Sequence, residues 1–252
     1  MSLIVKEVNA SSILNKSKIY DYCLNPFTGC QFSCKYCYAR LFIRRFSGHK
    51  ESWGEFVDVK INAPELLKKQ LIRARMGKVW VSSVTDPYQP LEKKHELTRQ
   101  CLKELAKIQF PVVIQTKSEL VLRDLDLIQE FEDIEVGFTI TTDDERVAEL
   151  FEPHASPVKQ RLMALEKIHA QGIRTFAFIG PILPGNPKKL VALLEGKTDS
   201  VLIDRMNYLA SIKRFYYQHE LMKATTNKFF YEYKNRLTEE LRKRRLNFEV
   251  LF

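Results

Sequence analysis

The pattern of apolar and polar positions along the chain predicts six buried strands separated by helices. Six apolar, β-branched runs of about strand length lack the polar alternation of half-exposed strands, and they span residues 19–24, 79–84, 112–116, 134–140, 175–182 and 201–206. Continuous apolar runs of this kind are typical of strands that are buried on both faces of a parallel sheet.

The segments between these runs have apolar positions at helical spacing, over residues 63–76, 97–108, 122–131, 145–151 and 158–171. Pro64 opens the first segment and Gly172 follows the last, as helix start and stop signals do. Alternating strands and helices predict βα units with right-handed crossovers. A closed barrel of this type needs eight units. Six units therefore predict an α/β fold, a partial (βα)6 TIM-type barrel with parallel strands.

The C-terminal segment follows a different pattern. Residues 210–246 contain no strand-like run and are rich in Tyr, Lys and Arg, which predicts one or two amphipathic helices. We expect residues 1–209 to form the barrel and residues 210–252 to form a basic helical extension packed on it. Aromatic side chains beside basic ones could also stack on nucleic-acid bases, but their spacing favours a packed helix face.

Composition indicates a globular protein without a membrane span. The chain has 252 residues, of which 45% are hydrophobic, enough for one sizeable core. No apolar stretch approaches the roughly 18 residues of a membrane span, and residues 1–13 lack the apolar run of a signal peptide. We therefore expect a cytoplasmic location. The net charge of +9 favours nucleic acid as a partner, although a basic helix is often only a solvated face.

Four of the five cysteines lie within fifteen residues, and the full set is Cys23, Cys30, Cys34, Cys37 and Cys101. Such a cluster predicts a metal site rather than a disulfide framework. Its core is C-x3-C-x2-C, a loop of thiolates of the kind that holds iron–sulfur clusters. A structural zinc site would need four ligands. Cys23 could be a fourth ligand, but it lies in the first predicted strand, which favours a packed thiol.

Three cysteine ligands would leave one iron of a cubane cluster open to a small molecule. The spacing of Cys30, Cys34 and Cys37, with aromatic Tyr36 before the last cysteine, resembles the signature of the radical S-adenosylmethionine (SAM) superfamily. The resemblance implies a 4Fe–4S cluster whose unique iron binds the amino and carboxylate groups of SAM. It also implies reductive cleavage of SAM to a 5′-deoxyadenosyl radical that abstracts hydrogen from a substrate. Tyr36 would lie near the adenine.

Further motifs resemble the spore photoproduct lyase-like group, also called DNA repair photolyase-like. They lie in order at the predicted strand ends, at residues 24–40, 59–67, 85–90, 116–118, 138–142, 152–157 and 180–185. By this resemblance Lys117 contacts the SAM carboxylate as a point charge. Thr85 and Thr139 hydrogen-bond its amino-acid end, and Tyr38 lies near SAM.

The resemblance also gives Arg161 a role, in which it organises the site through a buried ion pair with Glu152. A surface salt bridge between the two residues is the alternative. Asp86, which lies between Thr85 and Pro87, is expected to shape the turn that follows the second strand.

The chain departs from spore photoproduct lyases at one position. Those enzymes carry a hydrogen-donating cysteine three residues before the aspartate that matches Asp86, and this chain has Ser83 there. A serine O–H bond is too strong to replace it, so we expect an unknown substrate, with nucleic acid as one candidate, and not thymine-lesion repair. Turnover would need a reducing partner such as a flavodoxin or ferredoxin. The rival hypothesis is a metal-stabilised nucleic-acid-binding module without catalysis.

Overall fold

The computed structural model describes residues 3–252, apart from the side chains of residues 44 and 45. The chain forms two compact units. Unit 1 contains the residues up to Ser33 together with Ala39–Val136, and unit 2 contains Cys34–Tyr38 and Gly137–Phe252. The 210–252 segment is therefore part of unit 2, and the expected boundary at residue 209 stays a prediction.

Unit 1 contains the first predicted strands, in the spatial order β2-β3-β6-β7-β8. Their bounds are β2 (Leu14–Lys16), β3 (Tyr22–Leu24), β6 (Val79–Val81), β7 (Val112–Thr116) and β8 (Ile134–Thr139). Strands β3, β6 and β7 are parallel, and β2 is antiparallel to β3 at the edge. β8 begins in unit 1 and ends in unit 2. The predicted run at 112–116 matches β7 residue for residue, whereas the runs at 19–24 and 79–84 give shorter strands.

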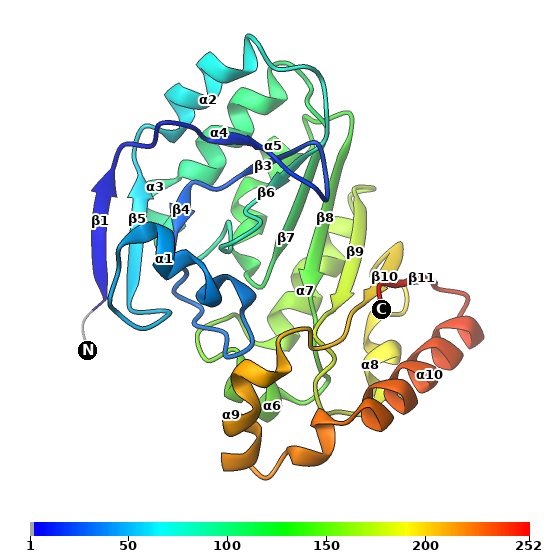
Figure 1. Cartoon of the computed structure of the whole chain (residues 1–252). Coiled ribbons are helices and arrows are strands. Elements are labelled where there is room, and N and C mark those ends of the chain that lie inside the picture. The colour runs from blue at the N-terminus through cyan, green and yellow to red at the C-terminus, as the bar shows by residue number, and fades with distance from the viewer. Residues whose placement is uncertain (1–2) are drawn as a thin grey trace. The chain divides into compact units, whose positions relative to one another are not determined.

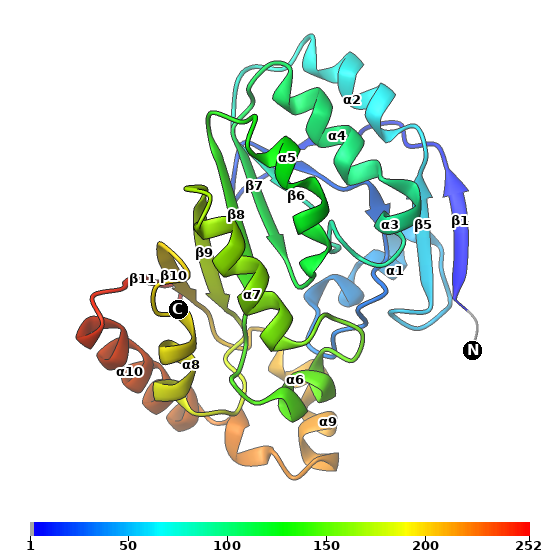
Figure 2. The ribbon, with the colours of Figure 1, turned by 180° about the vertical axis from the view of Figure 1, so that it is seen from behind.

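Helices α2, α4 and α5 of unit 1 lie on one side of β6 and β7, as Figure 2 shows. The helical segments are η1 (Tyr38–Leu41), α1 (Ile43–Ser47), α2 (Ala63–Leu71), α3 (Glu92–His95), α4 (Leu97–Ala106), η2 (Glu119–Asp124) and α5 (Leu125–Ile128). The helix predicted over 122–131 begins earlier, because the hydroxyl of Ser118 accepts a hydrogen bond from the backbone N–H of Leu120 and caps η2.

A small second sheet in unit 1 was not predicted. It contains β1 (Ile4–Val8), β5 (Phe56–Lys60) and β4 (Phe27–Thr28), in the order β1-β5-β4. Phe27, Val57 and Val59 form a buried cluster with Leu97 at the start of α4. This packing fixes β4, whose last residue is followed directly by Gly29 and the cysteines.

Unit 2 carries the later strands in the order β8-β9-β10-β11. The bounds are β9 (Arg174–Ile179), β10 (Ser200–Ile203) and β11 (Asn247–Val250), and β10 is parallel to both neighbours. The helical segments are α6 (Glu145–Phe151), α7 (Val158–His169), α8 (Pro187–Leu194), η3 (Leu209–Ile212), α9 (Lys213–Gln218), η4 (Met222–Thr225) and α10 (Asn227–Lys243). Figure 1 shows α10 beside α8.

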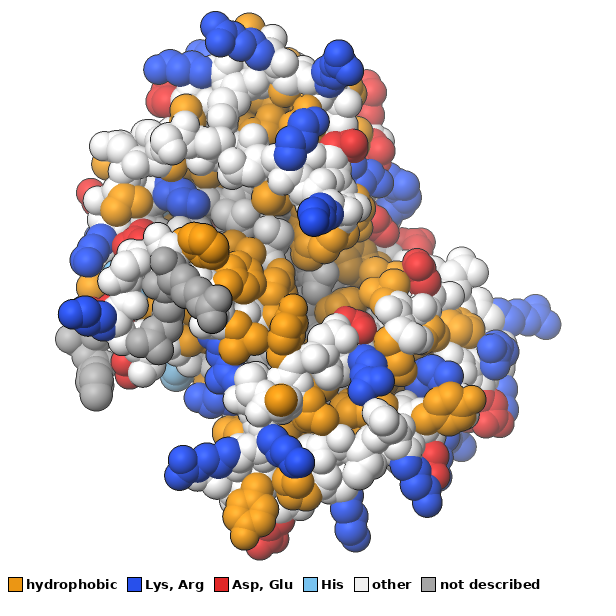
Figure 3. Space-filling view, in the orientation of Figure 1, with side chains coloured by type: hydrophobic (Ala, Val, Ile, Leu, Met, Phe, Trp, Pro, Cys, Tyr) orange, Lys and Arg blue, Asp and Glu red, His pale blue; other side chains and the backbone are white. Residues whose placement is uncertain are grey.

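The C-terminal aromatic residues divide into two groups. Tyr216, Phe230 and Tyr233 are buried, in agreement with the expected packing, whereas Tyr217 and Tyr231 are exposed. Lys and Arg side chains are scattered over the face in Figure 3 and do not form one continuous patch. Within the described part of the chain, no helix combines the length and apolar character needed to cross a bilayer.

Candidate functional site in the cysteine loop

The cysteine loop, residues 29–37, begins at a position that requires glycine. Gly29 has φ +90°, and an added Cβ would lie 2.3 Å from the backbone oxygen of Phe56. Two tight turns follow, because the N–H of Ser33 donates to the carbonyl of Cys30 (3.3 Å) and that of Cys37 donates to Cys34 (3.1 Å). Cys30, Cys34 and Cys37 are not joined in disulfides, and the side chains of Cys30 and Cys34 are buried.

In unit 1 the predicted residue Thr85 contacts the start of this loop. Its hydroxyl donates to the carbonyl oxygen of Gly29 at 2.7 Å. Gln89, which the sequence reasoning missed, lies in the same turn and is completely buried. Its amide donates to Gly29 and to Thr85 and accepts from the N–H of Gln31. The only sequence signal for Gln89 is its place in the 85–90 motif.

Asp86 links the turn after β6 to the end of β7 and to Lys117. Its carboxylate accepts from the hydroxyl of Thr116 (2.6 Å) and from the backbone N–H groups of Lys117 (2.9 Å) and Tyr88 (3.0 Å). Burial raises the pKa of Asp86, and the positive charge of Lys117 and these donors act against that rise. The expected turn-shaping role of Asp86 agrees with these contacts, which also fix the main chain of Lys117.

Unit 2 contains a buried polar group around Tyr36, which lies between Cys34 and Cys37. The hydroxyl of Tyr36 donates to Oε1 of Glu152, and that oxygen also accepts from the hydroxyl of Thr141 at 3.1 Å. Nη1 of Arg161 lies 2.5 Å from Oε2 of Glu152. The sequence left open a buried or a surface ion pair, and the structure has the buried one, since both side chains are at most 1% exposed.

Arg161 is held in place by the backbone as well as by Glu152. Its Nη1 donates to the carbonyl of Thr139 (3.0 Å) and its Nε to that of Ser156 (2.6 Å). Thr139, at the end of β8, is thereby connected to the same buried group. Burial acts to lower the pKa of Arg161, but the Glu152 carboxylate outweighs it and raises the pKa. The guanidinium therefore stays charged.

Burial raises the pKa of Tyr36 well above its usual value, and the negative charge of Glu152 adds to the rise. The phenol is therefore neutral and acts as a hydrogen-bond donor to the carboxylate. Tyr38 has a different environment. It is 37% exposed and stacks on Tyr208, with ring centroids 6.3 Å apart and planes inclined by 21°.

The residues fit an iron–sulfur cluster by their donor chemistry. Among the described residues, no group of three His, Cys, Asp or Glu side chains is arranged to hold an ion. The fit therefore rests on the three cysteine side chains in one short loop, which form no disulfide and are the ligand type that iron–sulfur clusters take. Cys101 is outside this set: it is buried in α4 and its pKa is raised by burial. Cys23 lies within β3.

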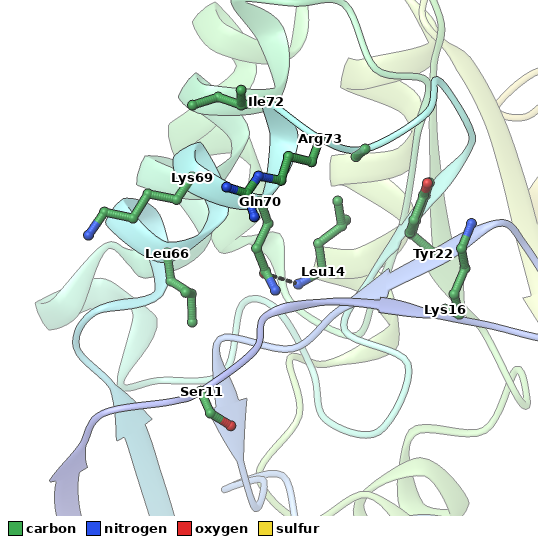
Figure 4. Close-up of a pocket in the computed structure, with 10 residues that line it drawn as sticks. Ser11, Leu14, Lys16, Tyr22, Leu66, Lys69, Gln70, Ile72 and Arg73 are labelled. Atoms are coloured by element: carbon green, nitrogen blue, oxygen red, sulfur yellow. Dashed lines mark hydrogen bonds between the residues drawn. The ribbon is translucent and has the colours of Figure 1, made fainter.

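A groove of about 720 Å³ in unit 1 is separate from these residues. Figure 4 shows it beside Leu14, Gln70 and Arg73, near the first residue of β3, Tyr22. The predicted residues Thr85 and Lys117 follow the carboxyl ends of β6 and β7 instead, the end where sites of βα folds lie. The groove is therefore not the candidate site.

Comparison with known proteins gives a family for most of the chain. The family model described as the radical SAM superfamily matches residues 24–195. An uncharacterized protein from Methanocaldococcus jannaschii is 41% identical over 180 residues, which are 71% of this chain and 67% of that protein. Another, from Acidianus two-tailed virus, is 32% identical over 173 residues, 66% of this chain and 57% of its own. The chain thus spans between about half and two thirds of these relatives.

A named relative is more distant. A radical SAM Nalpha-GlyT isomerase of Pseudomonas phage M6 is 22% identical over 162 residues, 64% of this chain and 33% of its own.

The solved structures support the predicted fold. A mutant of spore photoproduct lyase superposes with a TM-score of 0.73 at 16% identity, covering 98% of this chain and 82% of that one. Streptococcus suis SuiB bound to S-adenosylmethionine superposes with a TM-score of 0.60 at 11% identity. The superposition covers 100% of this chain and 51% of SuiB. At these identities the likeness concerns the fold, and the predicted α/β partial barrel is confirmed.

Proposed function

Since this chain belongs to the radical SAM superfamily, we propose that Cys30, Cys34 and Cys37 hold a 4Fe–4S cluster for reductive cleavage of SAM. The chain is a radical SAM enzyme. The observation that carries the cluster assignment is the C-x3-C-x2-C set of cysteines, none of them in a disulfide, inside the matched region.

The chain's own residues would bind and orient SAM. When bound, the cluster supplies the electron that cleaves SAM to methionine and a 5′-deoxyadenosyl radical, which takes a hydrogen atom from the substrate. In this proposal Lys117 attracts the SAM carboxylate as a point charge. The hydrogen bond between its backbone N–H and Asp86 supports the role, because it fixes the main chain from which the lysine extends.

We assign Thr85 and Thr139 to the amino-acid end of SAM, Tyr36 to the adenine and Tyr38 to a position near SAM. The position of Thr85 supports this role, because its hydroxyl donates to the carbonyl of Gly29, the residue before Cys30. The Tyr36 ring is fixed through its hydroxyl, which is bonded to Glu152. Arg161 then acts as a positioning residue, because it reaches the loop through that carboxylate.

Nucleic acid is the substrate class that we propose. The net charge of +9 favours a polyanion, and one solved spore photoproduct lyase is complexed with a dinucleoside spore photoproduct. SuiB, in contrast, is bound to a precursor peptide, so the fold does not fix the substrate class. Ser83 accepts a hydrogen bond from Asn25 and supplies no thiol, and the proposed substrate is therefore not the thymine lesion.

The cytoplasm is the proposed location, because free thiols and an iron–sulfur cluster persist where thiols are kept reduced. A flavodoxin or a ferredoxin is the proposed electron donor.

The decisive test uses protein reconstituted anaerobically with iron and sulfide, then given SAM and dithionite with and without single-stranded DNA or RNA. We expect 5′-deoxyadenosine by chromatography, its absence in Cys34→Ala, and its retention in Cys101→Ala, a control whose cysteine lies in α4. The alternative outcome is a colourless protein that contains zinc, forms no iron–sulfur chromophore and still binds the oligonucleotides. That outcome would support the rival hypothesis, a metal-stabilised nucleic-acid-binding module without catalysis.

A further inference from the structure

We infer that Gln89 is a positioning residue that fixes the peptide groups on both sides of Cys30, an inference that rests on the proposed cluster. Gly29 and Gln31 flank this cysteine, and one buried amide holds both. Nε2 of Gln89 donates to the carbonyl of Gly29 (3.3 Å), and Oε1 accepts from the N–H of Gln31 (3.0 Å). The main chain of Cys30 is therefore held before and after its Cα.

The contact between the two chain segments that carry Gln31 and Gln89 is reciprocal. While the N–H of Gln31 donates to the Gln89 side chain, the Gln31 side chain accepts from the N–H of Leu91 at 2.7 Å. Each segment thus binds the backbone of the other. The 85–91 turn and the start of the cysteine loop consequently form one hydrogen-bonded assembly within unit 1.

Position 89 requires a side chain that carries a hydrogen-bond donor and an acceptor at the same distance from its Cα. Nε2 of Gln89 also donates to the hydroxyl oxygen of Thr85 (3.0 Å), so both the nitrogen and the oxygen of the amide have partners. Glutamate would lack the donors, and asparagine is one methylene shorter. Because Gln89 is 0% exposed, water cannot replace a lost partner there.

The effect expected of this arrangement is a cysteine that is already in place before the cluster is assembled. Cys30 is buried at 7% exposure in the structure, and the carbonyl of Gly29 has two donors, Thr85 and Gln89. Removing the Gln89 side chain leaves the Gly29 carbonyl with one donor, Thr85, and takes away the acceptor of the Gln31 N–H. Cys30 would then sample open conformations more often.

Gln109 is a matched control for a general loss of stability. Its side chain also donates to two backbone carbonyls, Ala106 and Glu130, and accepts from one backbone N–H, that of Glu132. It lies between α4 and β7, and none of these three partners belongs to the cysteine loop. A Gln→Met change at either position removes three hydrogen bonds and keeps a similar side-chain length, with one of the three partners of Gln89 being the Thr85 hydroxyl and Gln109 being only partly buried.

The test compares the parent, Gln89→Met and Gln109→Met in two assays, with Gln31→Met as a milder variant if Gln89→Met does not fold. The first assay maps iodoacetamide labelling of each cysteine in the reduced, cluster-free chain. We expect Cys30 in Gln89→Met to label about tenfold faster than in the parent, since one or two lost hydrogen bonds correspond to about that factor. Cys101 should stay unchanged, and Gln109→Met should match the parent at Cys30.

The second assay reconstitutes the cluster and records its iron and sulfide content and its electron paramagnetic resonance spectrum with and without SAM. We expect a lower cluster content and an altered spectrum in Gln89→Met only. A parent that binds a cluster, with Cys30 labelling and spectra of Gln89→Met equal to those of Gln109→Met, overturns the inference and leaves the proposed function standing. A parent that takes up no cluster overturns the proposed function and the positioning role together.

Discussion

The cysteine loop is held by two groups of contacts with opposite physical character. The Cys30 anchor, in unit 1, consists of Gly29, Gln31, Thr85 and Gln89, and all of its hydrogen bonds join neutral groups. The Tyr36 anchor, in unit 2, consists of Tyr36, Thr141, Glu152 and Arg161, and its centre is a buried ion pair. Cys30, a proposed cluster ligand, is thus held through neutral groups, and Tyr36, later in the same loop, through an ion pair.

The difference concerns what happens when one member is lost. A neutral hydrogen bond contributes about 0.5–1.5 kcal/mol, and the Gly29 carbonyl keeps a second donor after one is removed. A buried ion pair adds little net stability, but removing one partner leaves an uncompensated charge and costs about 3–5 kcal/mol. The Cys30 anchor should therefore weaken gradually and the Tyr36 anchor abruptly.

The largest effect is expected from Arg161→Met, which breaks the ion pair of the Tyr36 anchor. Glu152, at 0% side-chain exposure, would keep its charge without a cation. We expect the free energy of unfolding to fall by about 3–5 kcal/mol. Urea unfolding followed by far-ultraviolet circular dichroism measures this loss.

The double variant Glu152→Gln/Arg161→Met sharpens the comparison, because it removes both charges and keeps an acceptor for Tyr36. It should recover most of the loss, since replacing a whole buried pair is often close to neutral. If the single and double variants were equally unstable, packing and not charge would explain the role of Arg161.

An intermediate effect is expected from Tyr36→Phe at alkaline pH. The pKa of Tyr36 is raised in the folded chain, so folding favours the neutral phenol. This contribution to stability is complete below the ordinary tyrosine pKa of about 10 and is lost as pH rises from there through the raised pKa. Each such tyrosine lowers the free energy of unfolding by about 1.4 kcal/mol per pH unit in that range.

We therefore expect the free energy of unfolding, measured between about pH 10 and 11, to fall less steeply with pH in Tyr36→Phe than in the parent. The two slopes should differ by up to about 1.4 kcal/mol per pH unit, the contribution of one ionising group. Tyr217, which is 73% exposed, provides the control, and Tyr217→Phe should run parallel to the parent. Equal slopes in all three proteins would show that the Tyr36 hydroxyl is not held next to the carboxylate in solution.

The sequence predicted the parts of this comparison that depend on local pattern. Apolar runs located the strands, and helical spacing gave α6 with its observed ends, 145–151. Arg161 and Glu152 were singled out through a resemblance, and only the structure distinguishes a buried pair from a surface one. Burial depends on what packs over a residue, and a pattern within one segment does not contain that information.

The Cys30 anchor was missed for a related reason. Gln89 forms hydrogen bonds with residues about sixty positions away in the sequence. From the sequence alone, a polar residue in a turn is expected to be exposed to solvent. The sheet β1-β5-β4, which fixes β4 ahead of Gly29, was also not predicted. The residues of β1 are mostly exposed, so this strand has no buried apolar face that its sequence could reveal. Contacts between residues far apart in the sequence could not be predicted from local patterns, and these are the contacts that position the cysteine loop.

The smallest effect is expected from Thr85→Val, an isosteric change in the Cys30 anchor. The Gly29 carbonyl would lose its 2.7 Å bond but keep the one from Gln89, so the loss should be about 0.5–1.5 kcal/mol. Urea unfolding of Thr85→Val, Gln89→Met and the double variant forms a thermodynamic cycle. The losses of the single variants should not add up to that of the double variant, because each single change breaks the Thr85–Gln89 bond and each removes one of the two side-chain donors of the Gly29 carbonyl. Strict additivity would mean that the two donors act on separate groups, and the anchor would not be a single assembly.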